Sequence, residues 1–425
     1  MPLLTVRCAG DPFAAIEIRD ADHLAVATGT GEVAADAEPG SYGFFAAASG
    51  RQSFRRLDVR EADAVVELQL GPYPSAAPTD GTSTDVGGHG AATQSLSERL
   101  VSTGAGGCAV GIILRRPAGA SAGQLAGRRD GSWPVELAAD GRRQDLAWSA
   151  PFASRSGDDC ITAGSPVRPG TYIATIGDDS ASSLVVPAWE GWQTLLFLPV
   201  TGDGIAASLA VVHVVPIEAP WTPTLALARL LDQLHWALIE RPEVTDACLR
   251  ALHRDTDAGV LASPLVQLLL GTLVAASSTG ELARRQAGES LQVLSDQDLA
   301  GVVPSDVAAL RLAVIGDAGA TLAADPPVLA RSADILIARE SRNLQTIGGG
   351  VVDAMATRLA SSLWFRWLPT AGRQLDLLRI DSYSDDEWRE QLARAASAVS
   401  TVRSLEGVAT ASDPSTPSTR RLPPR

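Results

Sequence analysis

The alternation of apolar and polar residues over the first 72 positions is typical of short β-strands. In one run Val66 and Leu68 are separated by Glu67, the pattern of a strand with one buried face. Runs of this kind, punctuated by Gly, Asp and Pro, occur at residues 3–8, 14–18, 23–27, 42–46, 54–59 and 64–70. We therefore expect residues 1–72 to form a small β-sandwich-like unit.

A second group of strand-like runs follows a stretch of different composition. Residues 73–106 are dominated by Gly, Ser, Thr, Pro and Ala, which predicts a flexible linker. Apolar runs then recur at 109–115, 134–138, 144–148, 172–176, 182–186, 194–198 and 208–215. We expect residues 107–220 to form a second β-sandwich-like unit.

The two β regions share one short motif. Glu38-Pro39-Gly40-Ser41-Tyr42 is followed 130 positions later by Arg168-Pro169-Gly170-Thr171-Tyr172. Pro presets φ and Gly accepts a positive φ, so both segments predict a turn that leads into a strand. Two copies of one sandwich module is the economical interpretation, and chance similarity between two Pro-Gly hairpins is the alternative.

The hydrophobic period changes to that of a helix at Trp221. Thr222-Pro223 fits an N-cap and first helical position, and leucines recur at 227, 230, 231, 234 and 238. Residues 265–276 are apolar nearly all round, which predicts a helix at the centre of a bundle. Further helices are expected at 281–287, 290–299, 306–315, 327–341, 351–367 and 385–405, the last with a Ser384/Glu387 capping box.

These elements predict an α+β multidomain chain, with two small β-sandwich-like units followed by an all-α helical domain. The helical domain is expected to span residues 221–408. The Pro/Ser/Thr-rich tail at 409–425 is expected to be disordered.

The amino-acid composition argues against several classes of function. The chain has 35 basic and 49 acidic residues, a net charge of −14, which argues against a nucleic-acid partner. Every basic residue is Arg, so no Walker lysine, kinase lysine or Schiff-base lysine exists. We expect no signal peptide, because residues 1–15 show no basic segment followed by an apolar one. We also expect no membrane span, because the most apolar stretch, residues 261–276, is shorter than about 20 residues.

The cysteines and histidines give no recognisable catalytic or metal-binding motif. The four cysteines are widely spaced and form no C-x-x-C pair, so we expect reduced thiols in a cytoplasmic protein and neither a metal nor another cofactor. Cys160 and His213 are the one Cys/His pair worth testing as a nucleophile and base. Asp158 and Asp159 precede Cys160 and would raise its thiol pKa, so we predict no catalytic residue.

Aromatic residues offer the one candidate binding set. Trp189 and Trp192 flank a predicted strand, and Tyr172 follows the second Pro-Gly turn. Exposed aromatic rings on a β-sandwich could stack on sugars or anchor a protein interface. Packing in the core is the alternative for each of them.

The helical half resembles an accessory module found in bacterial conflict systems. That module accompanies caspase-like (CHAT) or trypsin-like peptidases and often stands beside Pro-Gly-Tyr β-sandwich units. The likeness lies in residues 263–271 (SPLVQLLLG), 304–312 (PSDVAALRL), 325–332 (DPPVLARS) and 363–367 (LWFRW). Ser263 stands where the module has Asn, and the family's peptidase domain is absent from this sequence.

The resemblance implies an accessory protein rather than the peptidase itself. We therefore expect a non-catalytic scaffold or adaptor that binds another protein, a protease or an effector, in bacterial defence or signalling. Two alternatives remain open. One is a hydrolase with its site between the second β unit and the helical domain. The other is a carbohydrate-binding module that uses exposed Trp and Tyr side chains.

Overall fold

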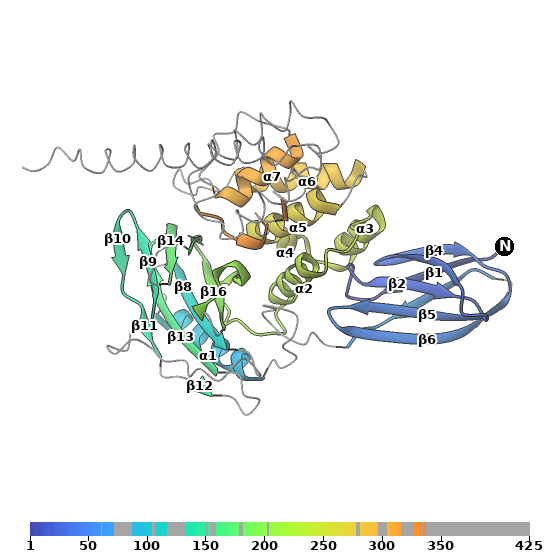
Figure 1. Ribbon diagram of the computed structural model, residues 1–425, viewed down its shortest axis with the longest axis horizontal. Coiled ribbons are helices and arrows are strands. Elements are labelled where there is room, and N and C mark those ends of the chain that lie inside the picture. Colours follow the sequence, from blue (N-terminus) through green and yellow to red (C-terminus); the bar gives the residue numbers. More distant parts are fainter. Residues whose placement is uncertain are drawn as a thin grey trace, which may run out of the picture.

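The computed structural model describes residues 1–60, 62–71, 87–103, 107–116, 133–149, 152–153, 159–177, 182–201, 204–277, 281–295, 304–315, 326–332 and 335–336. The helices expected at 351–367 and 385–405, the aromatic motif at 363–367 and the tail at 409–425 lie outside these residues. Within them, strands fill the N-terminal half and helices gather after residue 220 (Figure 1), which confirms the mixed α+β class.

The N-terminal region folds as two packed sheets. Its strands are β1 (Leu3–Cys8), β2 (Ala15–Arg19), β3 (Ala25–Thr30), β4 (Glu32–Asp36), β5 (Gly40–Ala48), β6 (Arg51–Val59) and β7 (Ala64–Leu68). One sheet has the order β4-β1-β7 and the other β3-β2-β5-β6, with β1 and β7 parallel. Val6, Ile16 and Phe44 belong to one apolar cluster that draws on both sheets, so the sheets form a sandwich.

The second β region repeats this arrangement. Its strands are β8 (Cys108–Arg116), β9 (Val135–Ala139), β10 (Arg142–Gln144), β11 (Ala147–Trp148), β12 (Phe152–Ala153), β13 (Asp159–Val167), β14 (Gly170–Ile176), β15 (Ser182–Ala188), β16 (Trp192–Thr201), β17 (Gly204–Ile205) and β18 (Val211–Pro216). The order β13-β8-β16 matches β4-β1-β7, again with one parallel pair, and β10-β9-β14-β15 matches β3-β2-β5-β6. β18 extends the first of these sheets beyond β16.

The shared Pro-Gly-Tyr motif has the same structure in both sandwiches. The Tyr42 hydroxyl donates to the Glu38 carbonyl oxygen at 2.9 Å, and the Tyr172 hydroxyl donates to the Arg168 carbonyl oxygen at 3.0 Å. Each tyrosine is buried and ties the turn before its strand to the strand itself, as in the tyrosine corner of β-sandwiches. The motif, the bond and the strand order therefore repeat together.

The expected linker at 73–106 is wrong over α1 (Gly87–Thr103), which is a helix packed on the second sandwich. Its Leu96 and Leu100 are buried against the sheet. A Cβ atom at Gly164 would lie 2.9 Å from Leu96 Cδ1 and 3.0 Å from Leu100 Cδ2, and one at Gly111 would lie 2.9 Å from Leu96 Cδ2. Two glycines thus open space for two leucines, a tertiary effect that composition does not reveal. Residues 72–86 and 104–106 of the expected linker are outside the described residues.

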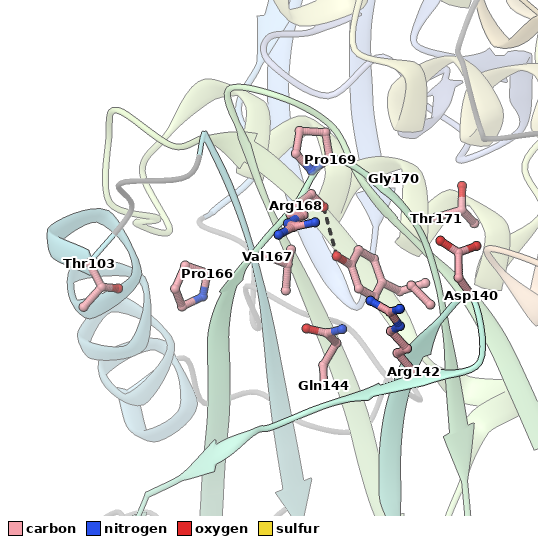
Figure 2. A pocket seen from close by; sticks show the side chains of 12 residues that line it. Thr103, Asp140, Arg142, Gln144, Pro166, Val167, Arg168, Pro169, Gly170 and Thr171 are labelled. Carbon is pink, nitrogen blue, oxygen red and sulfur yellow. Dashed lines mark hydrogen bonds between the residues drawn. The ribbon is translucent and has the colours of Figure 1, made fainter.

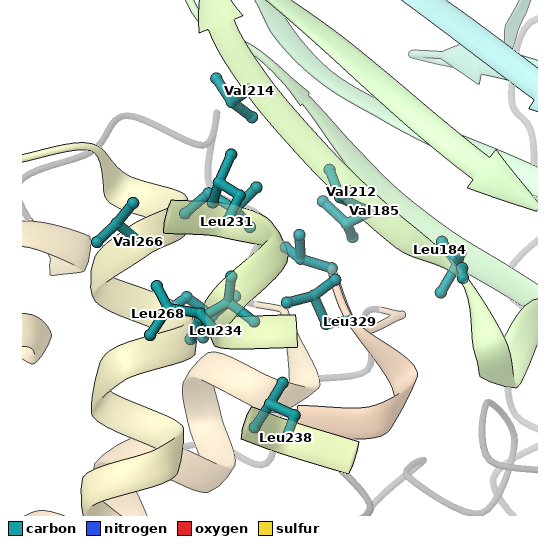
Figure 3. Close-up of a cluster of buried hydrophobic side chains, with 14 of the residues drawn as sticks. Leu184, Val185, Val212, Val214, Leu231, Leu234, Leu238, Val266, Leu268 and Leu329 are labelled. Carbon is teal, nitrogen blue, oxygen red and sulfur yellow. The ribbon is translucent and has the colours of Figure 1, made fainter. Parts of the chain in front are cut away.

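The helical region contains α2 (Ala226–Glu240), α3 (Asp246–Asp255), α4 (Ala258–Leu261), α5 (Pro264–Ser277), α6 (Glu281–Ser295) and α7 (Ser305–Ile315). Every residue of α5 from Pro264 to Ala275 is buried, and the helix contacts α2, α6 and α7. Figure 3 shows Val266 and Leu268 of α5 close to Leu231 and Leu234 of α2. The expected central position of this apolar helix is therefore confirmed.

The start of α2 differs from the expectation. Thr222 is not its N-cap, because the helix begins at Ala226 after a turn in which the Leu225 N–H donates to the Thr222 carbonyl. Trp221 explains the later start of the helix. Its backbone N–H donates to Ser97 Oγ of α1 at 2.6 Å, and its side chain is fully buried. Because these contacts fix Trp221 against α1 and the sheet, helical geometry begins only after the following turn.

The N-terminal sandwich meets the helical region at α2 and α3. Phe13 is buried in the apolar cluster of the helices rather than in the core of its own sandwich. Around it the Cys248 thiol donates to the Pro12 carbonyl at 2.8 Å, and the Ser49 N–H donates to Glu240 Oε1 at 2.7 Å. Among the helices of the described residues, none has the length and apolar character needed to cross a membrane.

Candidate functional site

A concave surface, here called the groove, lies on the side of the second sandwich. It encloses about 1040 Å³ between β10, the β13–β14 turn and the end of α1 (Figure 2). Its lining residues are Thr103, Ala139, Asp140, Arg142, Gln144, Pro166, Val167, Arg168, Pro169, Gly170, Thr171 and Tyr172. The second Pro-Gly-Thr-Tyr motif therefore forms one wall of the groove.

Two turns position the polar side chains of the groove. Asp140 and Gly141 join β9 to β10 with φ values of 49° and 70°, the pair of positive φ angles that a tight Asp-Gly hairpin turn requires. This turn sets Arg142 at the start of β10. On the opposite wall the Tyr172 hydroxyl holds the Arg168 carbonyl, and burial raises the pKa of Tyr172, so that the phenol remains a donor.

Two arginine side chains line the groove. Arg142 and Arg168 are exposed, and neither has an ion-pair partner among the described residues. The neighbouring Arg143 differs, because it forms an ion pair with Glu136 outside the groove. Asp140 is the one carboxylate in the lining. A guanidinium group presents several donors in a planar fork that matches a carboxylate or a phosphate.

The described lining residues differ in kind from a typical catalytic set. Among them there is no histidine, no cysteine and no pair of carboxylates, the groups on which nucleophilic and general acid–base mechanisms depend. The hydroxyl group of Thr103 donates to the carbonyls of Arg99 and Leu100 within its own helix, and no base contacts it. The described residues also contain no cluster of His, Cys, Asp and Glu able to hold a metal ion.

A second polar cluster lies buried between β18 and α2. Trp221 Nε1 donates to His213 Nδ1 at 3.0 Å, and His213 Nε2 lies 3.3 Å from Asp232 Oδ1. His235 stacks on His213 with ring centroids 6.0 Å apart, and its Nε2 lies 3.0 Å from the Val212 carbonyl. All four side chains of the cluster are buried.

The protonation of this cluster follows from its partners. An indole N–H can only donate, so His213 Nδ1 must accept, and the proton of the neutral ring is on Nε2, facing Asp232. Burial lowers the pKa of His213 to about 3, and burial together with His213 lowers that of His235 to about 3. Burial raises the pKa of Asp232 well above its ordinary value. Neutral, enclosed rings of this kind fasten α2 to the sheet.

The structure separates Cys160 from His213. Cys160 lies on β13 and His213 on β18, with β8 and β16 between them in the sheet. Three strand spacings amount to about 14 Å, too far for a thiol and an imidazole to share a proton.

The three predicted binding residues lie in different surroundings. Tyr172 is on the groove wall but only 4% exposed. Trp189 and Trp192 flank the turn between β15 and β16, are partly buried against the main apolar cluster and do not line the groove. Binding through Trp189 and Trp192 stays a prediction.

Sequence reasoning missed Arg142 of the groove and Asp232 of the buried pair. The Asp140-Gly141 dipeptide is a hairpin signal that could have placed Arg142 on an edge strand. Asp232, an acid inside a leucine-rich helix, could have indicated a buried polar partner. Arg142 and Arg168 line one groove, and Asp232 faces His213, because of the way strands and helices are arranged in the fold. The local sequence pattern does not predict that arrangement.

No family model and no curated protein matches the chain. Among solved structures, one from Bacteroides uniformis is described as a "putative cell adhesion protein". It shares 7% identity at a TM-score of 0.15, over 51% of this chain and 97% of that one. A structure from Bacteroides eggerthii with the same description shares 9% identity at a TM-score of 0.14, over 52% and 96%. Likenesses this low assign neither a fold nor a function.

Proposed function

We propose that this protein is a non-catalytic scaffold or adaptor that binds another protein through the groove of its second sandwich. The observation that carries the proposal is the lining of that groove. Among the described residues it offers two guanidinium groups without an ion-pair partner, a half-buried amide and exposed prolines, and no histidine, cysteine or pair of carboxylates. Such a surface can hold a partner and orient it, but it has no means of its own to cleave a bond.

The state of the reactive side chains elsewhere favours the same role. Burial, the largest influence on each thiol, raises the pKa of Cys8 and Cys248 to about 12 and that of Cys108 to about 11. A thiol with so high a pKa is protonated and a poor nucleophile at neutral pH. His213 and His235 are neutral and enclosed.

The biological setting rests on the resemblance of the helical half. A helical module of this kind accompanies peptidases in bacterial conflict systems, so the partner in our proposal is a protease or an effector. The setting we propose is cytoplasmic bacterial defence or signalling. The carbohydrate-binding alternative would instead use Trp189, Trp192 and Tyr172.

A hydrolase is the second candidate, because one observation favours it. His213 and Asp232 face each other at 3.3 Å between the second β unit and α2, the location expected for a hydrolytic site. Both are fully buried, so substrate access would require α2 to move away from β18. Hydrolysis of peptide or ester substrates by the purified chain, lost in His213→Gln, would favour this candidate over the scaffold.

The scaffold proposal is tested by cross-linking from the groove. Thr103, exposed at the end of α1 on the rim, is replaced by a photo-reactive phenylalanine in the full chain expressed in its native host. Arg229, exposed on α2 beside the opposite edge of the sandwich, receives the same group as the matched control. We expect one protein to be cross-linked from position 103 and not from 229. Equal labelling from both positions, or none from 103, would contradict the proposal.

A further inference from the structure

The edge strand beside the groove carries polar residues on the side that faces the sandwich interior. Across β10 and β9, Arg142 pairs with Ala139 and Gln144 with Leu137. Directly opposite residues of an antiparallel pair lie on the same face, and Leu137 is fully buried in the core. Arg142 and Gln144 therefore lie on the core-facing side, and Figure 2 shows both in the groove.

The first sandwich shows what normally fills this position. Counted from the two tyrosine corners, Ile18 and Leu137 are equivalent, because each pairs with the second residue after its tyrosine. The next strand places Ala27 opposite Ile18 and Gln144 opposite Leu137. Ala27 packs against the apolar core. The second sandwich has the amide of Gln144 in place of that methyl group.

The charge in the groove comes from two separate elements that converge. Arg142 follows the β9–β10 turn, and Arg168 lies in the β13–β14 turn. A single inward-facing charge would suffice to protect an edge strand from pairing with another chain. Arg142 on β10 and Arg168 in the β13–β14 turn, both without a carboxylate partner in the described residues, exceed that need in a chain of net charge −14.

We propose that the groove binds an extended acidic segment of the partner protein, whose carboxylates pair with Arg142 and Arg168. This inference rests on the proposed scaffold function and specifies the chemistry of its ligand. Pro166 and Pro169 are exposed on the rim and provide apolar contact for the segment between its acidic residues. Gln144 and Asp140 supply an amide and an acceptor for its backbone.

The size of the groove favours a peptide segment over a small anion. Its volume of about 1040 Å³ is at the upper end of the range for sites that enclose small molecules, and the groove is open along one side. Carboxylates on a flexible chain can reach both guanidinium groups, whereas a single small anion would leave most of the groove empty. Because these pairs are partly solvated, binding should weaken as the salt concentration rises.

The test begins with random dodecapeptides displayed on phage and selected at low salt on the immobilised full chain. Display fusions have no free peptide carboxyl terminus, so any acidic preference comes from side chains. The best selected peptide is then synthesised with a fluorophore and an amidated end, and its Kd is measured by anisotropy. The variants are Arg142→Gln/Arg168→Gln and the control Arg229→Gln/Arg250→Gln, which removes the same charge from exposed helix positions.

We expect the selected peptides to be rich in Asp and Glu. The Kd should rise tenfold or more in Arg142→Gln/Arg168→Gln, the loss expected for two charge-assisted pairs, and stay unchanged in the control. Peptides without acidic residues, no selected peptide, or equal Kd values in the two variants would overturn the inference. A partner still cross-linked from position 103 under those outcomes would leave the scaffold proposal standing and remove only the acidic ligand.

Discussion

Tyr42 and Tyr172 each stabilise the turn before their own strand with one side-chain hydrogen bond. Each donates a hydrogen bond to the carbonyl four residues earlier, at 2.9 Å and 3.0 Å, and each is buried beneath the turn that it closes. In the second sandwich that carbonyl belongs to Arg168, so the same bond that stabilises the fold also positions a charged side chain of the groove.

Removing either hydroxyl group should cost the stability of one hydrogen bond. Tyr42→Phe and Tyr172→Phe are each expected to lower the free energy of unfolding by about 0.5–1.5 kcal/mol, measured by urea denaturation. Tyr172→Phe should also weaken peptide binding in the groove, because Arg168 loses its anchor. Tyr42→Phe is the matched control for that effect. Equal binding by both variants would mean that the tyrosine corner does not position Arg168.

The buried histidines should make stability depend on pH. The pKa of His235 is about 3 in the folded protein and about 6.5 in an unfolded chain. Between these values the unfolded state binds the extra proton, so stability falls as the pH falls. One such histidine contributes a slope of about 1.4 kcal/mol per pH unit between about pH 6 and pH 4.

His235→Gln should reduce that slope by about the same amount, because glutamine keeps a donor for the Val212 carbonyl but does not titrate. Asp232, whose pKa burial raises, acts in the opposite direction in both proteins and drops out of the comparison. The free energy of unfolding, measured at several pH values for the two proteins, gives both slopes. Identical slopes would indicate that His235 is not held neutral by burial.

At the level of elements, the local sequence pattern predicted strands in which apolar and polar residues alternate clearly. It missed strands whose residues are chosen for packing against other elements. β1 has the expected bounds, Leu3–Cys8. β13 was missed although it is central to its sheet, because its segment (DCITAGSPV) combines Gly and Pro with few large apolar residues. The absence of a side chain at Gly164 leaves room for the leucines of α1. The sequence of β13 is therefore explained by the packing of the helix on it.

Gly164→Ala should displace α1. The added Cβ would lie 2.9 Å from Leu96 and 3.3 Å from the Val110 carbonyl, and overpacking of this kind costs about 1–3 kcal/mol. Trypsin should then cleave faster after Arg99 within the helix. Gly288→Ala is the control, because its Cβ meets nothing within 4 Å in α6 and should stabilise by about 0.5–1 kcal/mol. Unchanged cleavage in Gly164→Ala would mean that α1 packs elsewhere.

The candidate site was predictable only in part. The Pro-Gly-Thr-Tyr turn that forms one groove wall could be found in the sequence as half of an internal repeat. The opposite wall could not be found in the sequence. Arg142 and Arg168 are far apart along the chain, and the sheet order β10-β9-β14 brings them to the same groove. Hydrophobic period identifies faces of strands, but which strands become neighbours depends on the packing of the whole unit.

At the scale of the whole molecule, the described residues form two large apolar clusters and a smaller third one between the second sandwich, α1 and α2. The N-terminal sandwich encloses its own cluster, while the second sandwich and the helices share one. Phe13 and a few hydrogen bonds link the two parts. The second sandwich and the helical region should therefore unfold as one unit, and the first sandwich as another.

Calorimetry of the full chain should resolve these two units as two transitions. Phe44 is fully buried in the first core, so Phe44→Ala should remove about 3–5 kcal/mol from that unit and lower only its transition. Leu269→Ala, in the second core, is the reciprocal variant and should lower only the other transition. A single transition that shifts in both variants would show that the molecule unfolds as one cooperative unit.

We propose that the partner binds at the groove and not at the buried His213–Asp232 pair. Hydrogen–deuterium exchange of the full chain, with and without the partner identified by cross-linking, distinguishes the two sites. We expect slower exchange at 142–144 and 166–172 when the partner is bound, with no change at 211–216 or along α2. Protection confined to β18 and α2, with the groove unaffected, would contradict it.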